Sequence, residues 1–154
     1  MKTNALRILE AAHIPHEWIC YESAEGEIDA VSVAETLGVE AERVFKTLVA
    51  RGSATGVIVF CIPGPCELDL KKAAAVSGNK SLDLVKAREL KMLTGYVRGG
   101  CSPVGMKKAY PTWIDETALL FDRIYVSAGA HGIQVLLTPQ HLAAVVEANF
   151  ADVI

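Results

Sequence analysis

One short segment of the 154-residue sequence combines residue types that could bind a negatively charged oxygen. Residues 99–108 read Gly-Gly-Cys-Ser-Pro-Val-Gly-Met-Lys-Lys. Adjacent glycines leave their peptide N–H groups unobstructed and Pro103 stiffens the far end, so the segment could present donors to a carbonyl or an oxyanion. It has neither the Gly-Lys-Ser/Thr ending of a P-loop nor the spacing of a dinucleotide fingerprint. The alternative interpretation is an ordinary tight turn.

Thiols and imidazoles are the other groups that could do chemistry. Cys101 lies in the glycine-rich segment and could act as a nucleophile with His131 as its base, which defines a rival cysteine-hydrolase interpretation. None of the four cysteines forms a C-x-x-C pair, and His13 and His16 have no second pair of zinc ligands near them in the sequence. We therefore expect free thiols, no metal and no cofactor.

Charge is unevenly distributed along the chain. The net charge is −3, but residues 71–108 carry +7 and the remainder carries −10. A basic face of this kind could bind an anionic ligand such as nucleic-acid phosphate, because phosphate contacts need only local lysine and arginine. The alternative is a set of solvated helix faces.

The elements that must position these groups follow from hydrophobic periodicity and from capping residues. Ser32 and Glu35 have the spacing of a capping box, Asp69 is a potential N-cap, and Pro139 suits a first helical turn. We predict helices near residues 4–12, 32–37, 69–76, 86–93 and 139–148. We predict strands near residues 16–21, 44–50, 57–62, 96–98, 111–115, 124–127 and 133–137. Residues 44–50 and 57–62 should form an antiparallel hairpin whose second strand is central, because it is apolar on both faces.

The chain should form one mixed α/β domain over residues 1–154. The sequence is 51% hydrophobic and 21% charged, and it contains no internal repeat and no linker. The longest clear apolar run, residues 57–62, is far shorter than the roughly 20 residues of a membrane-spanning helix. Arg7 and Glu10 interrupt the stretch that a signal peptide would need to be apolar. We therefore expect no membrane association and a cytoplasmic location.

Several motifs occur together in a recognisable order. They are Phe-Lys-Thr-Leu at residues 45–48, Leu-Asp-Leu-Lys-Lys at 68–72, Gly-Tyr at 95–96, the segment 99–108, and Val-Ser-Ala-Gly at 126–129 before Gly132. With them the chain resembles the YbaK/EbsC family of Cys-tRNA(Pro) deacylases, free-standing relatives of the editing domain of bacterial prolyl-tRNA synthetases. The resemblance covers nearly the whole chain. It implies a central, mixed but mostly antiparallel curved sheet flanked by helices.

The resemblance also implies an activity, the hydrolysis of the ester between a wrong amino acid and the 3′-terminal adenosine of a tRNA. The catalytic residues that it implies are Lys46, Gly99, Gly100 and Ser102. The substrate-binding residues that it implies are Tyr21, Thr47, Cys101, Pro103, Gly129, His131 and Gln134. In relatives the position of His131 usually carries arginine or lysine, so a basic contact is in doubt here.

The mechanism implied by the resemblance needs no protein nucleophile. The thiol of the cysteinyl substrate attacks its own ester carbonyl, while the Gly99 to Pro103 loop and Lys46 stabilise charge. The implied partners are aminoacyl-tRNA and prolyl-tRNA synthetase, and the oligomeric state stays open. The alternative is a module that binds aminoacyl-tRNA or an aminoacyl-adenosine without cleaving it.

Overall fold

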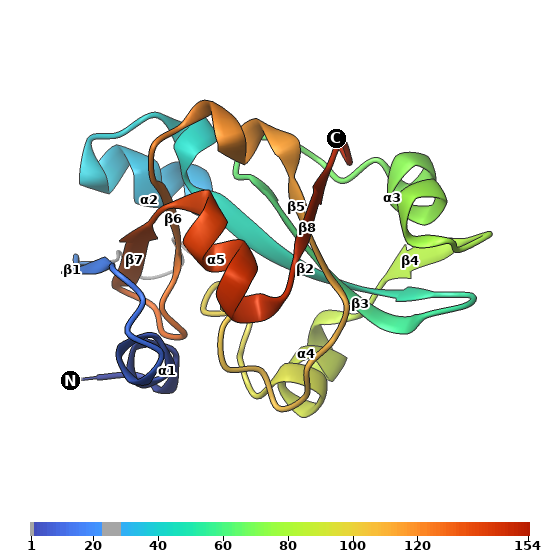
Figure 1. Ribbon diagram of the computed structural model, residues 1–154, viewed down its shortest axis with the longest axis horizontal. Helices are drawn as coiled ribbons and strands as arrows, with labels where there is room; N and C mark the ends of the chain where they lie inside the picture. The colour runs from blue at the N-terminus through green and yellow to red at the C-terminus, as the bar shows by residue number, and fades with distance from the viewer. Residues whose placement is uncertain (1, 23–28) are drawn as a thin grey trace.

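The computed structural model describes residues 2–22 and 29–154, and its fold belongs to the predicted mixed α/β class (Figure 1). Within the described residues the elements follow in this order: α1 (Asn4–Ala11), β1 (Glu17–Cys20), α2 (Ala30–Leu37), η1 (Ala41–Arg43), β2 (Phe45–Gly52), β3 (Gly56–Pro63), α3 (Leu70–Ser77), β4 (Leu82–Leu84), α4 (Ala87–Thr94), β5 (Thr112–Asp115), η2 (Glu116–Leu120), β6 (Ile124–Ser127), β7 (Ile133–Leu137), α5 (Pro139–Val146) and β8 (Asn149–Ala151). Here η marks a 3₁₀-helix. All five predicted helices are present.

Capping residues determine where most of the helices begin. The Asp69 side chain accepts the N–H groups of Lys71 and Lys72 at 3.0 Å, which confirms its predicted role at the start of α3. Thr138 accepts the N–H of His141 at 3.1 Å before α5. Each bond satisfies a donor that the first helical turn would otherwise leave unpaired.

Helix α2 begins earlier than predicted. Its N-cap is Asp29, whose carboxylate accepts the N–H of Ser32 at 2.8 Å. Ser32 therefore lies inside the helix, and the predicted capping box from Ser32 to Glu35 is wrong. The carboxylate three residues upstream has taken the position that the serine would need. The predicted end is confirmed, because Gly38 caps the helix in the left-handed conformation with φ 70°.

A five-stranded sheet contains the predicted hairpin. Its strand order is β4-β2-β3-β5-β8, so β3 is central as predicted. Strands β2 and β3 are antiparallel, with Lys46 opposite Ile62 and Thr47 opposite Cys61, whereas β3, β5 and β8 run parallel. Both faces of β3 are buried, which explains its apolar residues on both faces.

The strands do not form one sheet. Strands β1, β7 and β6 make a separate three-stranded antiparallel sheet, which lies beside the larger one in Figure 1. An isolated bridge between Val44 and Tyr125 links the two sheets. The prediction of one central sheet is therefore wrong, and the strands form two sheets. The edge strands are β4 and β8 in the large sheet and β1 and β6 in the small sheet, and within the described residues none of these edges pairs continuously with the other sheet.

Two apolar clusters hold the helices against the sheets. One joins Leu6 and Leu9 of α1 and Leu142 of α5 to Phe45 of β2 and Val126 of β6. The other packs Ala73 and Ala74 of α3 against the opposite face of the large sheet, with Ile58, Phe60 and Ile62 from β3. Burying a large aliphatic or aromatic side chain contributes about 1.5–3 kcal/mol, so these contacts anchor both helix layers.

Residues 96–98 are not a strand. Tyr96 follows the C-cap Gly95 directly, and its hydroxyl donates to the carbonyl of Val104 at 2.5 Å. The segment therefore packs against the glycine-rich loop instead of pairing with a neighbouring strand. The sequence also gave no indication of β4 and β8, because three residues are too few to show a period.

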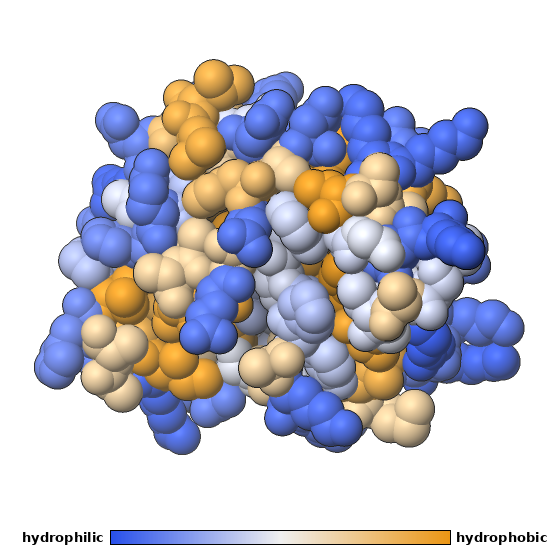
Figure 2. Space-filling model, turned by 45° about the vertical axis from the view of Figure 1, so that its right-hand side comes forward, coloured by the Kyte–Doolittle hydropathy of each residue, from blue (hydrophilic) through white to orange (hydrophobic). Residues whose placement is uncertain are grey.

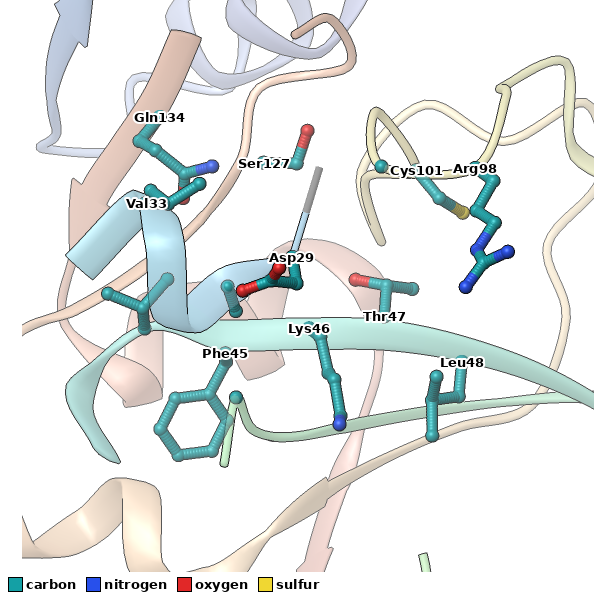
Figure 3. Close-up of a pocket in the computed structure, with 14 residues that line it drawn as sticks. Asp29, Val33, Phe45, Lys46, Thr47, Leu48, Arg98, Cys101, Ser127 and Gln134 are labelled. Carbon is teal, nitrogen blue, oxygen red and sulfur yellow. The ribbon is translucent and has the colours of Figure 1, made fainter. Parts of the chain in front are cut away.

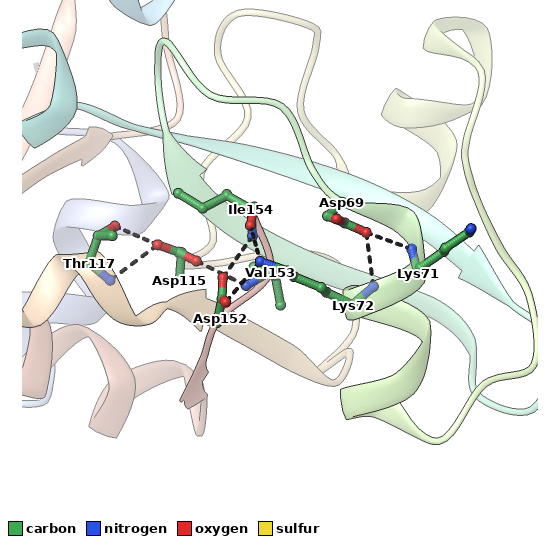
Figure 4. Close-up of polar contacts among 8 residues, drawn as sticks. All are labelled: Asp69, Lys71, Lys72, Asp115, Thr117, Asp152, Val153 and Ile154. Carbon is green, nitrogen blue, oxygen red and sulfur yellow. Dashed lines mark hydrogen bonds and ion pairs between the residues drawn. The ribbon is translucent and has the colours of Figure 1, made fainter.

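A buried carboxylate attaches the C-terminal residues to the sheet (Figure 4). Asp115 is fully buried, and it accepts the N–H groups of Val153 at 3.0 Å and of Thr117 at 3.1 Å. Lys72 adds an exposed ion pair with Asp152 at 2.9 Å. The attachment of the C-terminal residues to the interior therefore depends on the hydrogen bonds of Asp115, whereas the ion pair lies at the surface.

Replacing Asp115 by alanine is therefore expected to lower the free energy of unfolding by about 2–4 kcal/mol, because two backbone donors lose their acceptor. Urea unfolding measures the change. Asp152→Ala is the matched control and should have a much smaller effect, since solvent screens an exposed pair. Equal effects of the two substitutions would contradict the role given to Asp115.

The basic segment is folded onto one side of the molecule. It supplies α3 and β4, which lie at the right of Figure 1, and α4, which lies at the bottom of the same view. Figure 2 turns this side forward and shows hydrophilic side chains around the edge of the face, with apolar patches between them. Within the basic segment, Lys72 pairs with Asp152, and the carboxylate of Glu89 pairs with Arg51 of β2. No helix in the described ranges is long and apolar enough to cross a membrane.

Candidate active site

A cavity of about 290 Å³ opens beside the first half of β2 (Figure 3). It lies between the two sheets, the start of α2 and the loop that follows α4. Its lining residues are Asp29, Ala30, Val33, Val44, Phe45, Lys46, Thr47, Leu48, Gly64, Arg98, Gly99, Cys101, Ser127 and Gln134. Five predicted site residues thus share one cavity: Lys46, Thr47, Gly99, Cys101 and Gln134.

The cavity exists because one edge of β2 is only partly covered. Strand β4 pairs with residues 50–52 of β2 and no further, which leaves residues 45–48 with β3 alone as a partner. The carbonyl of Val49 accepts the N–H of Val85, so the peptide groups of Val49 point to this edge. Because peptide groups of alternate residues point to the same edge, those of Thr47 face the cavity.

Lys46 and Thr47 border different parts of the cavity. Figure 3 shows their side chains leaving β2 in opposite directions, as the alternation of a strand requires. The amine of Lys46 therefore points away from the glycine-rich loop. Lys46 has no ion-pair partner among the residues that the structure describes. Its flexible four-carbon stem leaves the amine able to follow an anionic ligand.

Of the predicted loop residues, Gly99 and Cys101 offer peptide donors that are free within the described part of the chain, whereas the donor of Gly100 is occupied. The N–H of Gly100 donates to the carbonyl of Val97 at 3.0 Å, so this donor is occupied. Gly99, with φ 83°, and Cys101 line the cavity, and their N–H groups have no acceptor within residues 2–22 and 29–154. These two donors can bind a carbonyl or oxyanion.

Tyr96 packs against the glycine-rich loop close to Gly105 and Gly129. A Cβ atom at Gly105 would lie 2.8 Å from the Tyr96 hydroxyl, and one at Gly129 would lie 2.8 Å from the Tyr96 ring. Both glycines have positive φ, so a side chain at either position would be strained as well as obstructed. Gly129, predicted as a substrate contact, thus makes room for Tyr96 instead of lining the cavity.

His131 supports the loop from the same side. Its Nε2 lies 3.1 Å from the carbonyl of Arg98, and a Cβ at Gly100 would lie 3.3 Å from its ring. His131 does not line the cavity. The structure therefore places it behind the loop, where it can influence the position of Arg98 and Gly100 without touching a ligand.

Ser102 and Pro103 also lie outside the cavity lining. Ser102 is fully buried, and its hydroxyl accepts the N–H of Val104 at 3.2 Å. Pro103 faces a second cavity, next to the end of α5. Both residues shape the loop, and neither presents a side chain to the cavity beside β2.

Cys101 has the wrong environment for a nucleophile. Burial raises the pKa of its thiol to about 11, so the thiol is protonated near neutral pH. No hydrogen bond between Cys101 and His131 occurs in the described part of the chain. The arrangement argues against the rival cysteine-hydrolase interpretation, which needs a thiolate and an adjacent base.

Gln134 and Tyr21 form one end of the site. The amide nitrogen of Gln134 lies 3.5 Å from the Tyr21 hydroxyl. Gln134 is 5% exposed, and its Oε1 has no partner among the described residues. Tyr21 itself is half-buried and is not among the residues that line the cavity.

Three polar lining residues were missed by the sequence reasoning. Asp29 was not considered, because its role as the N-cap of α2 was assigned to Ser32. Arg98 was assigned to a strand, although its position directly before the glycine pair could have indicated it. Ser127 was part of a quoted motif, and its hydroxyl accepts the N–H of Gly129 at 3.1 Å.

The cavity is polarised. Figure 3 shows Asp29, Ser127 and Gln134 on one side, and Arg98 extending from the loop toward β2 on the other. The described residues include no cluster of three or more His, Cys, Asp or Glu side chains able to hold a metal ion. The site can therefore bind an oxygen or phosphate on its cationic side and a hydrogen-bond donor on its acceptor side.

Comparison with known proteins adds a family and relatives. The model of the aminoacyl-tRNA editing domain family matches residues 25–145. The chain is 45% identical to the Enterococcus faecalis protein named "Putative Cys-tRNA(Pro)/Cys-tRNA(Cys) deacylase EbsC", over 99% of this chain and 93% of that protein. It is also 36% identical to proline–tRNA ligase of Thermosipho africanus, over 49% of this chain and 13% of that protein.

The fold is also similar to that of a solved structure of a related description. The fold is similar, with a TM-score of 0.83 and 28% identity, to a crystal structure described as that of "a putative trans-editing enzyme for prolyl tRNA synthetase". The superposition covers 99% of this chain and 98% of the other. The resemblance stated from the motifs is thus confirmed by independent sequence and structural similarity.

Proposed function

Because this chain belongs to the aminoacyl-tRNA editing domain family, we propose that it is a trans-editing deacylase that cleaves mischarged Cys-tRNA(Pro) in the cavity beside β2. Family membership supports action on an aminoacyl-tRNA ester. The relative named for Cys-tRNA(Pro) and Cys-tRNA(Cys) supports cysteine as the amino acid removed. We propose that residues 1–154 act as a single editing domain.

One observation carries the proposal. Lys46 of β2 and the loop residues Gly99 and Cys101, about 50 positions apart in the sequence, line the same cavity. Two unoccupied peptide N–H groups and two cations, Lys46 and Arg98, are thus available to one ligand. An aminoacyl ester at the end of a tRNA has both a carbonyl oxygen and nearby phosphates.

The proposed reaction uses the substrate's own thiol. The sulfur attacks the ester carbonyl carbon, and the N–H groups of Gly99 and Cys101 donate to the oxygen as it becomes negative. The bond from that carbon to the ribose 3′-oxygen then breaks, and the 3′-oxygen receives the proton that the thiol gives up. The products are a tRNA with a free 3′-hydroxyl and a thiolactone, which water opens to cysteine.

The remaining machinery has positioning roles in this proposal. Arg98 binds a phosphate or the developing oxyanion, and Lys46, whose amine points away from the loop, binds a phosphate. Ser102, Pro103, Gly129 and His131 maintain the loop. The basic side formed by residues 71–108 supplies further phosphate contacts, which predicts modest and salt-sensitive affinity for tRNA. Similarity to part of a proline–tRNA ligase supports that synthetase as the source of substrate. The cytoplasmic location stays a prediction.

A deacylation time course tests the function directly. Purified protein is incubated with tRNA(Pro) that carries labelled cysteine, and the label that remains on the tRNA is followed. We expect loss of label much faster than in buffer alone. The same tRNA carrying labelled proline is the control and should stay charged.

The result also separates cleavage from binding. A non-hydrolytic binding module would protect the cysteinyl ester, so the label would disappear more slowly than in buffer. That outcome would contradict the proposed deacylase and favour the binding alternative.

A further inference from the structure

An unsatisfied acceptor lies at the anionic end of the cavity. Gln134 on β7 is 95% buried, and its Oε1 has no hydrogen-bond partner among the described residues. Its amide nitrogen lies 3.5 Å from the Tyr21 hydroxyl, so the nitrogen has a partner and the oxygen has none among the described residues. A buried polar atom without a partner costs free energy, so this oxygen is suited to a donor supplied by a ligand.

A carboxylate borders the same end of the cavity. Asp29 caps α2 through the N–H and hydroxyl of Ser32, and it forms no ion pair with a described residue. The N–H of Ser32 lowers the pKa of this carboxyl, so it carries its charge at neutral pH. Figure 3 shows Asp29 and Gln134 on the side of the cavity away from Arg98.

We propose that Asp29 and Gln134 bind the α-ammonium group of the aminoacyl ester and so restrict the cavity to substrates with a free amine. This inference rests on the proposed function and adds a specificity to it. An ammonium has three donors and a positive charge, which match one amide oxygen and one carboxylate. With the ammonium at this end, the ester carbonyl and the terminal phosphates are directed toward the loop and Arg98.

The consequence is a filter against N-acylated esters. An acylated nitrogen is neutral and keeps a single N–H donor, and its acyl group would have to occupy the space beside Asp29. The ligand would then cover the carboxylate without supplying a positive charge, which is unfavourable. Peptidyl-tRNA and formylated aminoacyl-tRNA carry the same ester, and an enzyme with this filter would spare them.

Binding of two stable adenosine analogues tests the inference. One is 3′-deoxy-3′-(cysteinylamido)adenosine, and the other is the same compound with its α-nitrogen acetylated and its thiol free. Isothermal titration calorimetry gives both dissociation constants. We expect the free amine to bind about 10- to 100-fold more tightly, the range expected for hydrogen bonds to charged groups.

Three variants test whether Asp29 and Gln134 cause the preference for the free amine. Asp29→Asn keeps a good N-cap and removes the charge, and Gln134→Leu removes the acceptor, so each should reduce the preference to less than about threefold. Gln134→Glu adds a negative charge and should increase it. Glu35→Gln on the exposed side of α2 is the matched control and should leave the preference unchanged.

The outcomes distinguish failure of the amine filter from failure of the proposed deacylase activity. Equal binding of both analogues to the unmodified protein would overturn the filter and leave the deacylase intact. An unchanged preference in both Asp29→Asn and Gln134→Leu would overturn the assignment to these residues. If neither analogue binds and the cysteinyl-tRNA stays intact in the time course, the proposed function is overturned as well.

Discussion

Replacing Lys46 by alanine is expected to reduce deacylation of Cys-tRNA(Pro) by about a hundredfold or more, because the ester is misplaced at the loop when the cation that holds a substrate phosphate is removed. Lys46 stands at the uncovered edge of β2 and has no ion pair with a described residue. Its charge is therefore available to a phosphate of the substrate. Single-turnover deacylation measures the rate without the contribution of product release.

The fold should tolerate this substitution. Lys46 is partly exposed, and its side chain belongs to none of the apolar clusters, so circular dichroism and thermal unfolding should not change. Lys2→Ala is the matched control, because it removes an exposed lysine outside the basic segment and away from the cavity beside β2. Unchanged turnover in Lys46→Ala would refute the assignment of the site.

The second large effect is the dependence on the substrate's thiol. We expect Ser-tRNA(Pro) and Ala-tRNA(Pro) to be cleaved at least about a hundredfold more slowly than Cys-tRNA(Pro), because neither side chain can supply the attacking sulfur. A pocket that discriminates only by size reaches about 10- to 200-fold for one methylene. Serine and cysteine are close in size, so the serine ester isolates the contribution of sulfur.

The comparison is made with one tRNA and one protein preparation, so that binding of the nucleic acid stays constant. Rates at saturating protein separate chemistry from affinity. If the three esters disappear at equal rates, water is the attacking group and the thiol-assisted step is wrong. Loss of the serine and alanine rates alone in Lys46→Ala would indicate a separate route for those esters.

Much of the fold was predictable from local patterns. The hairpin of β2 and β3, the strands β6 and β7, and the end of α3 at Gly78 follow from residues that contact near neighbours in the sequence. The start of α2 was predicted wrongly, since Asp29 and Ser32 are both good caps and the sequence does not rank them. Strands β4 and β8 were missed, because their pairing depends on β2 and β5.

The sequence predicted which residues belong to the candidate site better than it predicted how they are arranged. The motifs indicated Lys46 and the glycine-rich loop, and both line the cavity. They did not indicate that the Gly100 N–H is occupied by Val97, or that Gly129 and His131 lie behind the loop. Arg98 was read as a strand residue, although its backbone forms a turn.

By itself, the sequence determined the family, the class of fold and the presence of a loop with peptide donors. These depend on short motifs, in which residue type alone restricts backbone conformation and capping. Only the tertiary structure decided that Asp29 and Gln134 border one end of a cavity and Arg98 the other. Such positions result from packing between segments many residues apart, and packing geometry cannot be read from the spacing of residues along the chain.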